Sequence, residues 1–279
     1  MTIVNELQRI ENNIKASYTA LAEKGAELPT KQNSDNLAST IANLEVGASS
    51  EWEEAVFSTG TPTKLEIPNK YKKVRDYAFY YASSTPTWEN NLEEIEGLEV
   101  EEIGEKAFYN QSEIKKINLP KVTRIGEGGL YNATSKVAEF VRLGALEYVG
   151  ASGLYNVFSN ENCDYSVTFA KGCELGNNAL YGWAINSFDF TGFKSIGGRV
   201  WGNNPVKMKV WIPKTVETIN ATSSAFSLFG ANRGHLIFTD VADEASVPEG
   251  WGKYWNNFST TKLTVNYGAT YEDFLNAEV

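Results

Sequence analysis

The stretch that decides the fold is Ile103-Gly104-Glu105-Lys106-Ala107-Phe108-Tyr109-Asn110. It reads as an aliphatic residue, glycine, two variable positions, a small residue, a large apolar residue and tyrosine. The block returns along the chain as Ile125–Asn132, Val149–Asn156 and Leu175–Gly182, in decayed form as Ile196–Gly202, earlier as Val74–Tyr80, and later at Ile219 with Ala225-Phe226 displaced by an insertion. So many copies in one chain indicate an internal repeat.

The spacing of the block is typical of a solenoid. Successive copies lie 21 to 29 residues apart, as Gly176 to Gly197 and Arg75 to Gly104 illustrate, which is the range of leucine-rich repeats. Alternating stretches between the blocks predict strands over 114–120, 165–169, 188–190 and 210–213. Because one coil cannot bury its apolar residues alone, stacked coils must bury them in continuous columns.

These patterns predict an α+β repeat solenoid with four parts. Residues 1–46 form a helical anchor or oligomerisation segment, and residues 51–72 hold the first strands, at 55–58 and 64–68. Residues 73–241 form the solenoid. Residues 242–279 form a cap, in which Trp251, Tyr254, Trp255 and Phe258 cover the end of the core before a strand over 262–267.

The repeat resembles the BspA-like, or type-5, leucine-rich repeat. That unit reads roughly I-G-x-x-A-F-x-x-C/N-x-x-L-x-x-I-x-L-P, and Ile103–Pro120 is the best copy here. The turn Val247-Pro248-Glu249-Gly250-Trp251 is similar to the usual end of such domains. The resemblance specifies the fold strongly and implies a surface adhesion or interaction module.

Residues 3–24 predict an amphipathic helix, followed by a second helix that starts near Ser34 and runs to Leu44. The apolar stripe of the first helix has spacings of three and four residues. It consists of Ile3, Leu7, Ile10, Ile14, Tyr18 and Leu21. The stripe has two interpretations, a hairpin between the two helices or an intermolecular contact. The second is favoured, because so short a segment is marginal for a core of its own.

The N-terminal segment also resembles a helical module of phage tail and appendage proteins. The resemblance lies in Asn13-Ile14, Tyr18-Thr19-Ala20-Leu21, Lys24-Gly25-Ala26, Pro29, Asn33–Ala38 and Thr40-Ile41. It implies a virion protein, made in the host cytoplasm, whose helices contact other virion proteins. A homo-oligomer, with a trimer as one form, is expected from the same stripe.

Composition excludes several classes of partner. The 279 residues carry a net charge of -10, so no basic face for nucleic acid is expected. No apolar run reaches the roughly 20 residues of a membrane span, and Met1–Glu6 turns polar at once, so neither membrane insertion nor a signal peptide is predicted. The two cysteines, Cys163 and Cys173, are open to pairing or to remaining free thiols, and free thiols are favoured.

Catalytic and cofactor signatures are missing from the sequence. The single histidine, His235, has no evident partner, and Cys163-x9-Cys173 lacks zinc-ligand spacing. Several glutamates between Glu93 and Glu105 alternate with apolar residues and predict a solvated face, although a glycosidase would need only two carboxylates. We therefore expect no enzyme, no metal and no cofactor.

The aromatic residues are the candidate ligand contacts. Four tyrosines share one repeat position, and two tryptophans add further rings. The candidates are Tyr109, Tyr131, Tyr155, Tyr181, Trp183 and Trp211. They form either stacked columns inside the solenoid or an exposed row that binds sugar or protein.

The favoured function is a non-enzymatic virion appendage (tail fibre, baseplate or head fibre) that attaches to a bacterial surface glycan or protein. A bacterial BspA-like interaction protein, in the cytoplasm or at the cell surface, and a glycan-cleaving enzyme of the cell wall are the alternatives.

Overall fold

The computed structural model describes residues 3–23, 30–37, 62–82, 89–134, 137–160, 162–202, 206–229, 234–258 and 261–279. The chain forms two compact units, residues 1–50 and 51–279. The strand expected over 55–58 lies outside the described residues. None of the described helices is long and apolar enough to cross a membrane.

The N-terminal unit contains helix α1 (Ile3–Glu23) and a short helical stretch over 34–37. Tyr18 is 1% exposed and packs against Ile14 and Leu37. Its hydroxyl donates a hydrogen bond to the Asn33 carbonyl at 2.9 Å. The second half of the predicted stripe therefore forms a helix–helix contact within the unit.

The first half of that stripe is uncovered within the described part of the unit. Leu7 is 61% exposed and Ile10 is 45% exposed. The side chains of Ile3 and Leu21 lie outside the described residues. The hairpin interpretation thus accounts for the Ile14–Tyr18 part of the stripe only.

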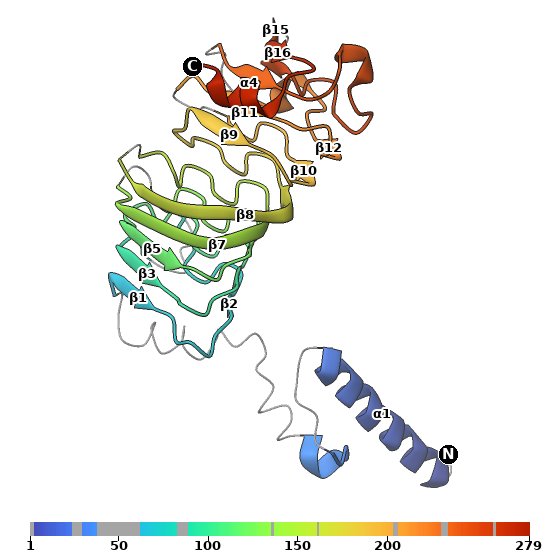
Figure 1. Ribbon diagram of the computed structural model, residues 1–279. Coiled ribbons are helices and arrows are strands. Elements are labelled where there is room, and N and C mark those ends of the chain that lie inside the picture. Colours follow the sequence, from blue (N-terminus) through green and yellow to red (C-terminus); the bar gives the residue numbers. More distant parts are fainter. Residues whose placement is uncertain are drawn as a thin grey trace. The chain divides into compact units, whose positions relative to one another are not determined.

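The second unit is a parallel β-solenoid (Figure 1). One column of its first sheet consists of β1 (Lys64–Glu66), β3 (Glu94–Glu96) and β5 (Lys116–Leu119). The other consists of β2 (Lys73–Val74), β4 (Glu102–Ile103), β6 (Arg124–Ile125), β10 (Ser195–Ile196) and β12 (Thr218–Ile219). Two long strands, β7 (Phe140–Val149) and β8 (Asp164–Leu175), run through both columns and join them. The repeat solenoid predicted from the block is confirmed.

A second parallel sheet continues the stack. It consists of β9 (Ser187–Asp189), β11 (Lys209–Trp211), β13 (Leu236–Phe238) and β16 (Thr264–Asn266). Strand β14 (Asn257–Phe258) pairs antiparallel with β15 (Thr261–Lys262), and two 3-10 helices span Ser224–Phe226 and Glu244–Ser246. Because β16 pairs with β13, strand pairing runs past residue 241, where the sequence placed the start of the cap.

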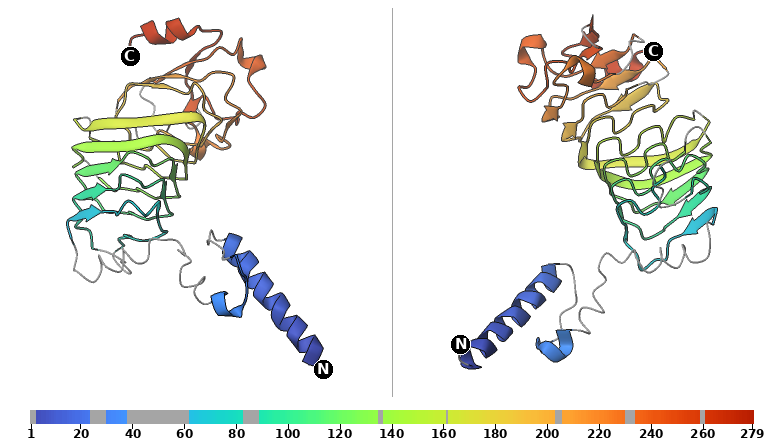
Figure 2. Two further views of the ribbon diagram at one scale, coloured as in Figure 1. Left: turned by 60° about the horizontal axis from the view of Figure 1, so that its bottom comes forward. Right: turned by 180° about the vertical axis from the view of Figure 1, so that it is seen from behind.

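Helix α4 (Tyr271–Asn276) lies at the C-terminal end of the stack (Figure 2). A capping box between Thr270 and Asp273 defines its start. Phe274, which is 2% exposed, packs against Trp211 and Phe238. The helix therefore covers one side of β11 and β13.

The core is built from repeat positions in register. The aliphatic residue that opens each block pairs with its counterparts in the neighbouring coils and is buried at every coil. This column is Val74, Ile103, Ile125, Val149, Leu175, Ile196 and Ile219. A second column stands at the large apolar position of the block. It consists of Phe79, Phe108, Leu130, Leu154, Leu180 and Val200. Equivalent residues thus bury one another, which is why the block must repeat.

A backbone conformation and a side-chain hydrogen-bond ladder explain the polar residue that ends each block. Each block ends in the left-handed region at Asn110, Asn132, Asn156 and Gly182, residue types that tolerate this conformation. The Asn156 Nδ2 group donates to Asn132 Oδ1 at 2.9 Å, and Asn132 donates to Asn110 in the same way at 3.2 Å. The asparagines therefore form a hydrogen-bonded ladder along the stack.

Candidate functional site

The four predicted tyrosines form one ladder, which Tyr80 extends at its N-terminal end. Ring centroids lie 4.5 Å apart for Tyr109 and Tyr131, 4.4 Å for Tyr131 and Tyr155, and 4.1 Å for Tyr155 and Tyr181. All four side chains are half-buried. Because each ring covers the face of the next, the ladder presents ring edges and hydroxyls to solvent. The ligand-contact role of these tyrosines stays a prediction.

At its C-terminal end the tyrosine ladder is next to the positively charged side chain of Arg199. The Arg199 guanidinium lies 5.4 Å from the centre of the Tyr181 ring. Burial, followed by the hydrogen bond with Tyr181, raises the pKa of the Tyr155 hydroxyl. The Tyr155 hydroxyl, at the centre of the ladder, is therefore partly desolvated.

The two predicted tryptophan contacts are buried, which agrees with the interior alternative for these rings and not with an exposed row. Trp183 is 8% exposed and lies 4.4 Å from the ring of Phe158. Trp211 is 5% exposed and faces Phe274 at 6.2 Å. Trp183 packs inside the solenoid against Phe158 and Phe188, whereas Trp211 lies on the face of β11 that helix α4 covers. Neither can serve as a surface platform in this conformation.

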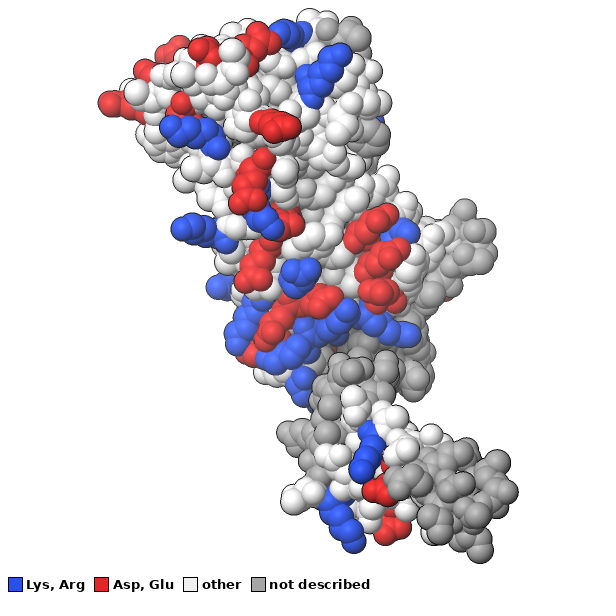
Figure 3. All heavy atoms as spheres, turned by 90° about the vertical axis from the view of Figure 1, so that its right-hand side faces the viewer, with Lys and Arg blue, Asp and Glu red and all other residues white. Residues whose placement is uncertain are grey.

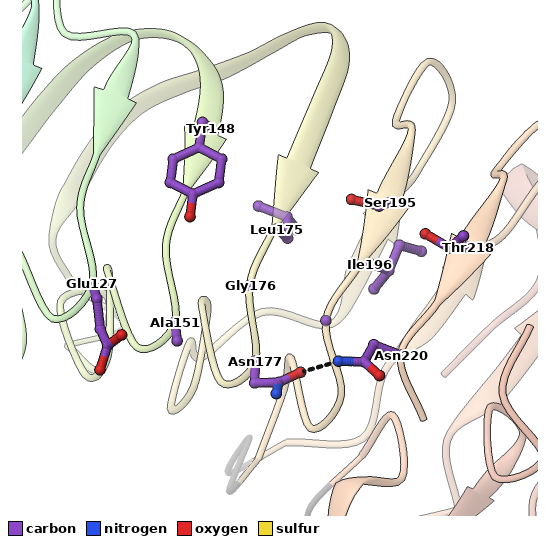
Figure 4. A pocket seen from close by; sticks show the side chains of 11 residues that line it. Glu127, Tyr148, Ala151, Leu175, Gly176, Asn177, Ser195, Ile196, Thr218 and Asn220 are labelled. Carbon is purple, nitrogen blue, oxygen red and sulfur yellow. Dashed lines mark hydrogen bonds between the residues drawn. The ribbon is translucent and has the colours of Figure 1, made fainter. Parts of the chain in front are cut away.

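A groove of about 370 Å³ runs over strands β7, β8, β10 and β12 and reaches the turn after β6, and the sequence interpretation did not anticipate it (Figure 4). Its lining comes from five successive coils, between residues 127 and 220 of the sequence. The lining residues are Glu127, Tyr148, Ala151, Leu175, Gly176, Asn177, Ser195, Ile196, Gly197, Thr218 and Asn220. Only the registered stacking of the coils brings this set together.

One wall of the groove is a row of outward-facing residues on adjacent strands. The side chains at the C-terminal end of this row are small. Tyr148, Glu174, Ser195 and Thr218 are register partners in adjacent strands. Glu174 accepts a hydrogen bond from Lys194 Nζ at 2.6 Å and does not line the groove. The row therefore steps down from a tyrosine ring to two small hydroxyl residues.

Amide groups lie at the opposite side of the groove. Asn177 Oδ1 accepts the Gly198 N–H at 2.8 Å and Asn220 Nδ2 at 3.1 Å (Figure 4). Glu127 is exposed, and within the described part of the chain its carboxylate has no hydrogen bond or ion pair. Among these lining residues Glu127 is the one carboxylate, so the groove does not contain the pair that glycoside hydrolysis ordinarily uses.

The first coils of the same face carry interleaved charges (Figure 3). Lys73 pairs with Glu102 at 2.7 Å. Glu99 pairs with Lys72 at 2.6 Å and with Lys121 at 2.5 Å, and hydrogen bonds from these two lysines lower the pKa of its carboxyl to about 2. These exposed pairs contribute little to stability individually, but they give this end of the face a balanced charge.

The histidine and the cysteines are placed in the interior. His235 is 1% exposed, stacks on Phe229 at 4.6 Å and accepts the Met208 N–H at its Nδ1. Cys163 and Cys173 are free and buried. They sit at opposite ends of β8, about 30 Å apart at the usual rise of a strand, so they cannot pair within one chain. Among the described residues, no group of three or more His, Cys, Asp or Glu is placed to hold a metal ion.

The fold and its surface define a class, that of repeat proteins with a protein-interaction or surface role. Residues 50–165 and 86–207 match the BspA-type leucine-rich repeat region, in six copies. These segments together cover more than half of the chain, which therefore belongs to the BspA-type leucine-rich repeat family. No curated protein matches the chain.

Proposed function

We propose that this protein is a non-enzymatic attachment protein of a virion, of the tail-fibre, baseplate or head-fibre type. Its repeat unit binds a glycan or protein on the bacterial host surface. The observation that supports this most is the single file of outward residues on the β2–β12 column, from Lys73 through Tyr148 to Thr218. Each coil contributes one outward side chain to a surface that varies while the buried columns stay constant.

The N-terminal unit serves as the anchor in this proposal. The exposed Leu7 and Ile10 lie on one helical stripe with Ile14 and Tyr18. Covering a large aliphatic side chain stabilises a contact by about 1.5–3 kcal/mol. A homo-oligomer, a trimer in the simplest case, or a contact with other virion proteins would remove these two side chains from water.

Binding to bacteria tests the attachment role. Fluorescently labelled full-length protein is mixed with the strain that carries the gene, with related strains and with unrelated strains. We expect saturable binding to a subset of related strains and none to the unrelated ones. Equal binding to all strains, or to none, would contradict attachment.

Particle composition tests the virion role separately. Antibody against the repeat unit, viewed by electron microscopy on purified particles, is expected to label one defined position on each virion. Label on the surface of uninfected cells instead would favour the first alternative, a bacterial BspA-like interaction protein, which the family membership also supports.

The second alternative is an enzyme that cleaves cell-wall glycan. It would have to use a pair of carboxylates outside the groove. Incubation of the protein with purified wall polysaccharide is expected to release no reducing ends. Their release at a rate proportional to protein concentration would replace the attachment proposal with an enzymatic one.

The mass of the protein in solution tests whether the N-terminal unit forms an oligomer. Light scattering of the full-length chain should give a multiple of 30.9 kDa. The double variant Leu7→Glu, Ile10→Glu should shift the mass to that of the monomer, because charges replace the exposed stripe. Ala16→Glu, also exposed on α1, is the matched control and should keep the oligomer. A monomeric wild type would remove the oligomer proposal.

A further inference from the structure

We propose that the groove across β7, β8, β10 and β12 binds a neutral oligosaccharide. This inference rests on the proposed attachment function and names the ligand class of the surface that carries it. Four features support it, namely the origin of the groove floor, its length, the charge of its lining and its unsatisfied amide groups.

The floor of the groove is a consequence of the fold. Gly176 and Gly197 stand where adjacent coils approach most closely, and a Cβ atom on Gly197 would lie 2.0 Å from the Gly176 carbonyl oxygen. A side chain at Gly197 would therefore push these two coils apart. The trough is imposed by stacking, whereas the residues on its two sides are free to vary and so to set specificity.

The length of the groove suits a short chain of sugar rings. It crosses four adjacent strands, and parallel strands are spaced about 4.8 Å apart, so it runs for about 14 Å. That is the length of a di- or trisaccharide lying across the strands. Tyr148 stands near one end, and the Arg124 guanidinium lies 4.8 Å from the centre of its ring.

The lining favours a neutral, hydroxyl-rich ligand. It contains a carboxylate, two asparagines, a serine, a threonine and a tyrosine, and no lysine or arginine. Phosphate, sulfate or uronate groups would lack a cation here, and the chain's net charge of -10 would oppose their approach. An apolar peptide side chain would also be unsuited, because Leu175 and Ile196 are almost fully buried in the floor.

The amide groups offer complementary hydrogen bonds. Asn177 Oδ1 already accepts two donors, and Asn220 Nδ2 is one of them. Within the described residues, Asn177 Nδ2 and Asn220 Oδ1 make no hydrogen bond, so the pair presents one donor and one acceptor. Neighbouring sugar hydroxyls, each both donor and acceptor, match this pair, and Glu127 adds a strong acceptor at the rim.

The test is a glycan array followed by titration calorimetry of the full chain. The array carries neutral probes (chito-, malto- and manno-oligosaccharides of three to six rings) and acidic probes (sialylated and galacturonate oligosaccharides). We expect binding to at least one neutral probe. Thr218→Trp, which fills the groove, and Asn177→Ala should each weaken it about tenfold or more, as the loss of one or two hydrogen bonds predicts.

Thr168→Trp is the matched control, because Thr168 is exposed on β8 and does not line the groove. It should bind the neutral probe as the wild type does, and thermal melts should show all three variants folded. Binding to acidic probes alone, to none of the probes, or equally to groove variants and wild type would overturn the inference. If bacterial cells still bind in those cases, attachment stands and only the ligand assignment fails.

Discussion

Replacing Tyr155 with leucine removes the centre of the tyrosine ladder. The ring stacks on Tyr131 at 4.4 Å and on Tyr181 at 4.1 Å. A stacked aromatic pair contributes about 0.5–1.5 kcal/mol beyond the area it buries, so the loss of two stacks should cost about 1–3 kcal/mol. Leucine keeps part of the apolar contact with the coils, which makes the stacking energy the main difference.

The assay is urea unfolding followed by tryptophan fluorescence and by circular dichroism. Tyr155→Phe keeps both stacks and loses only the hydroxyl hydrogen bond with Tyr181, so it should unfold within about 1 kcal/mol of the wild type. Tyr148→Leu is a matched control, because Tyr148 is also half-buried and lies in the same coil but its ring contacts the Arg124 guanidinium, not a ring stack. It should cost clearly less than Tyr155→Leu.

A Tyr155→Leu protein that unfolds at the same urea concentration as the wild type would refute the reasoning, since the ladder would then carry no stacking energy. The phenylalanine variant has a second use. If it keeps its stability but loses binding to bacteria, the row of hydroxyls is itself a contact surface.

Three further outcomes are expected. Gly197→Ala should destabilise the repeat unit by about 3 kcal/mol or more, because its Cβ would meet backbone of the adjacent coil; an unchanged urea midpoint would contradict this close approach. Burial raises the pKa of Cys163 to about 11 and that of Cys173 to about 12, so a disulfide reagent at pH 8 should label neither thiol in native protein and both in urea. Because the pKa of Glu99 is lowered, its stabilising contribution is present above its ordinary pKa of 4.5 and is lost as pH falls towards 2; carboxyl titration by NMR should place its midpoint near the lower value.

Several features followed from local patterns. The block around Ile103 predicts the buried columns, because a residue type that recurs once per coil has to meet its own counterparts in a stack. The same pattern brought the ladder tyrosines together. The helical stripe predicted α1, but its period alone could not distinguish the part covered by Leu37 from the part left exposed at Leu7.

The sequence by itself determined the repeat, its register and the membership of each column, since these depend on spacing along the chain. The tertiary structure decided which rings are buried, because Trp183 and Trp211 stand outside the repeated block. Rings of neighbouring coils cover Trp183, and helix α4 covers Trp211. The tertiary structure also determined that the groove forms. Glu127 and Asn220 are remote in the chain, and only the close glycine contact between coils, together with the small side chains at Ser195 and Thr218, places them along one hollow.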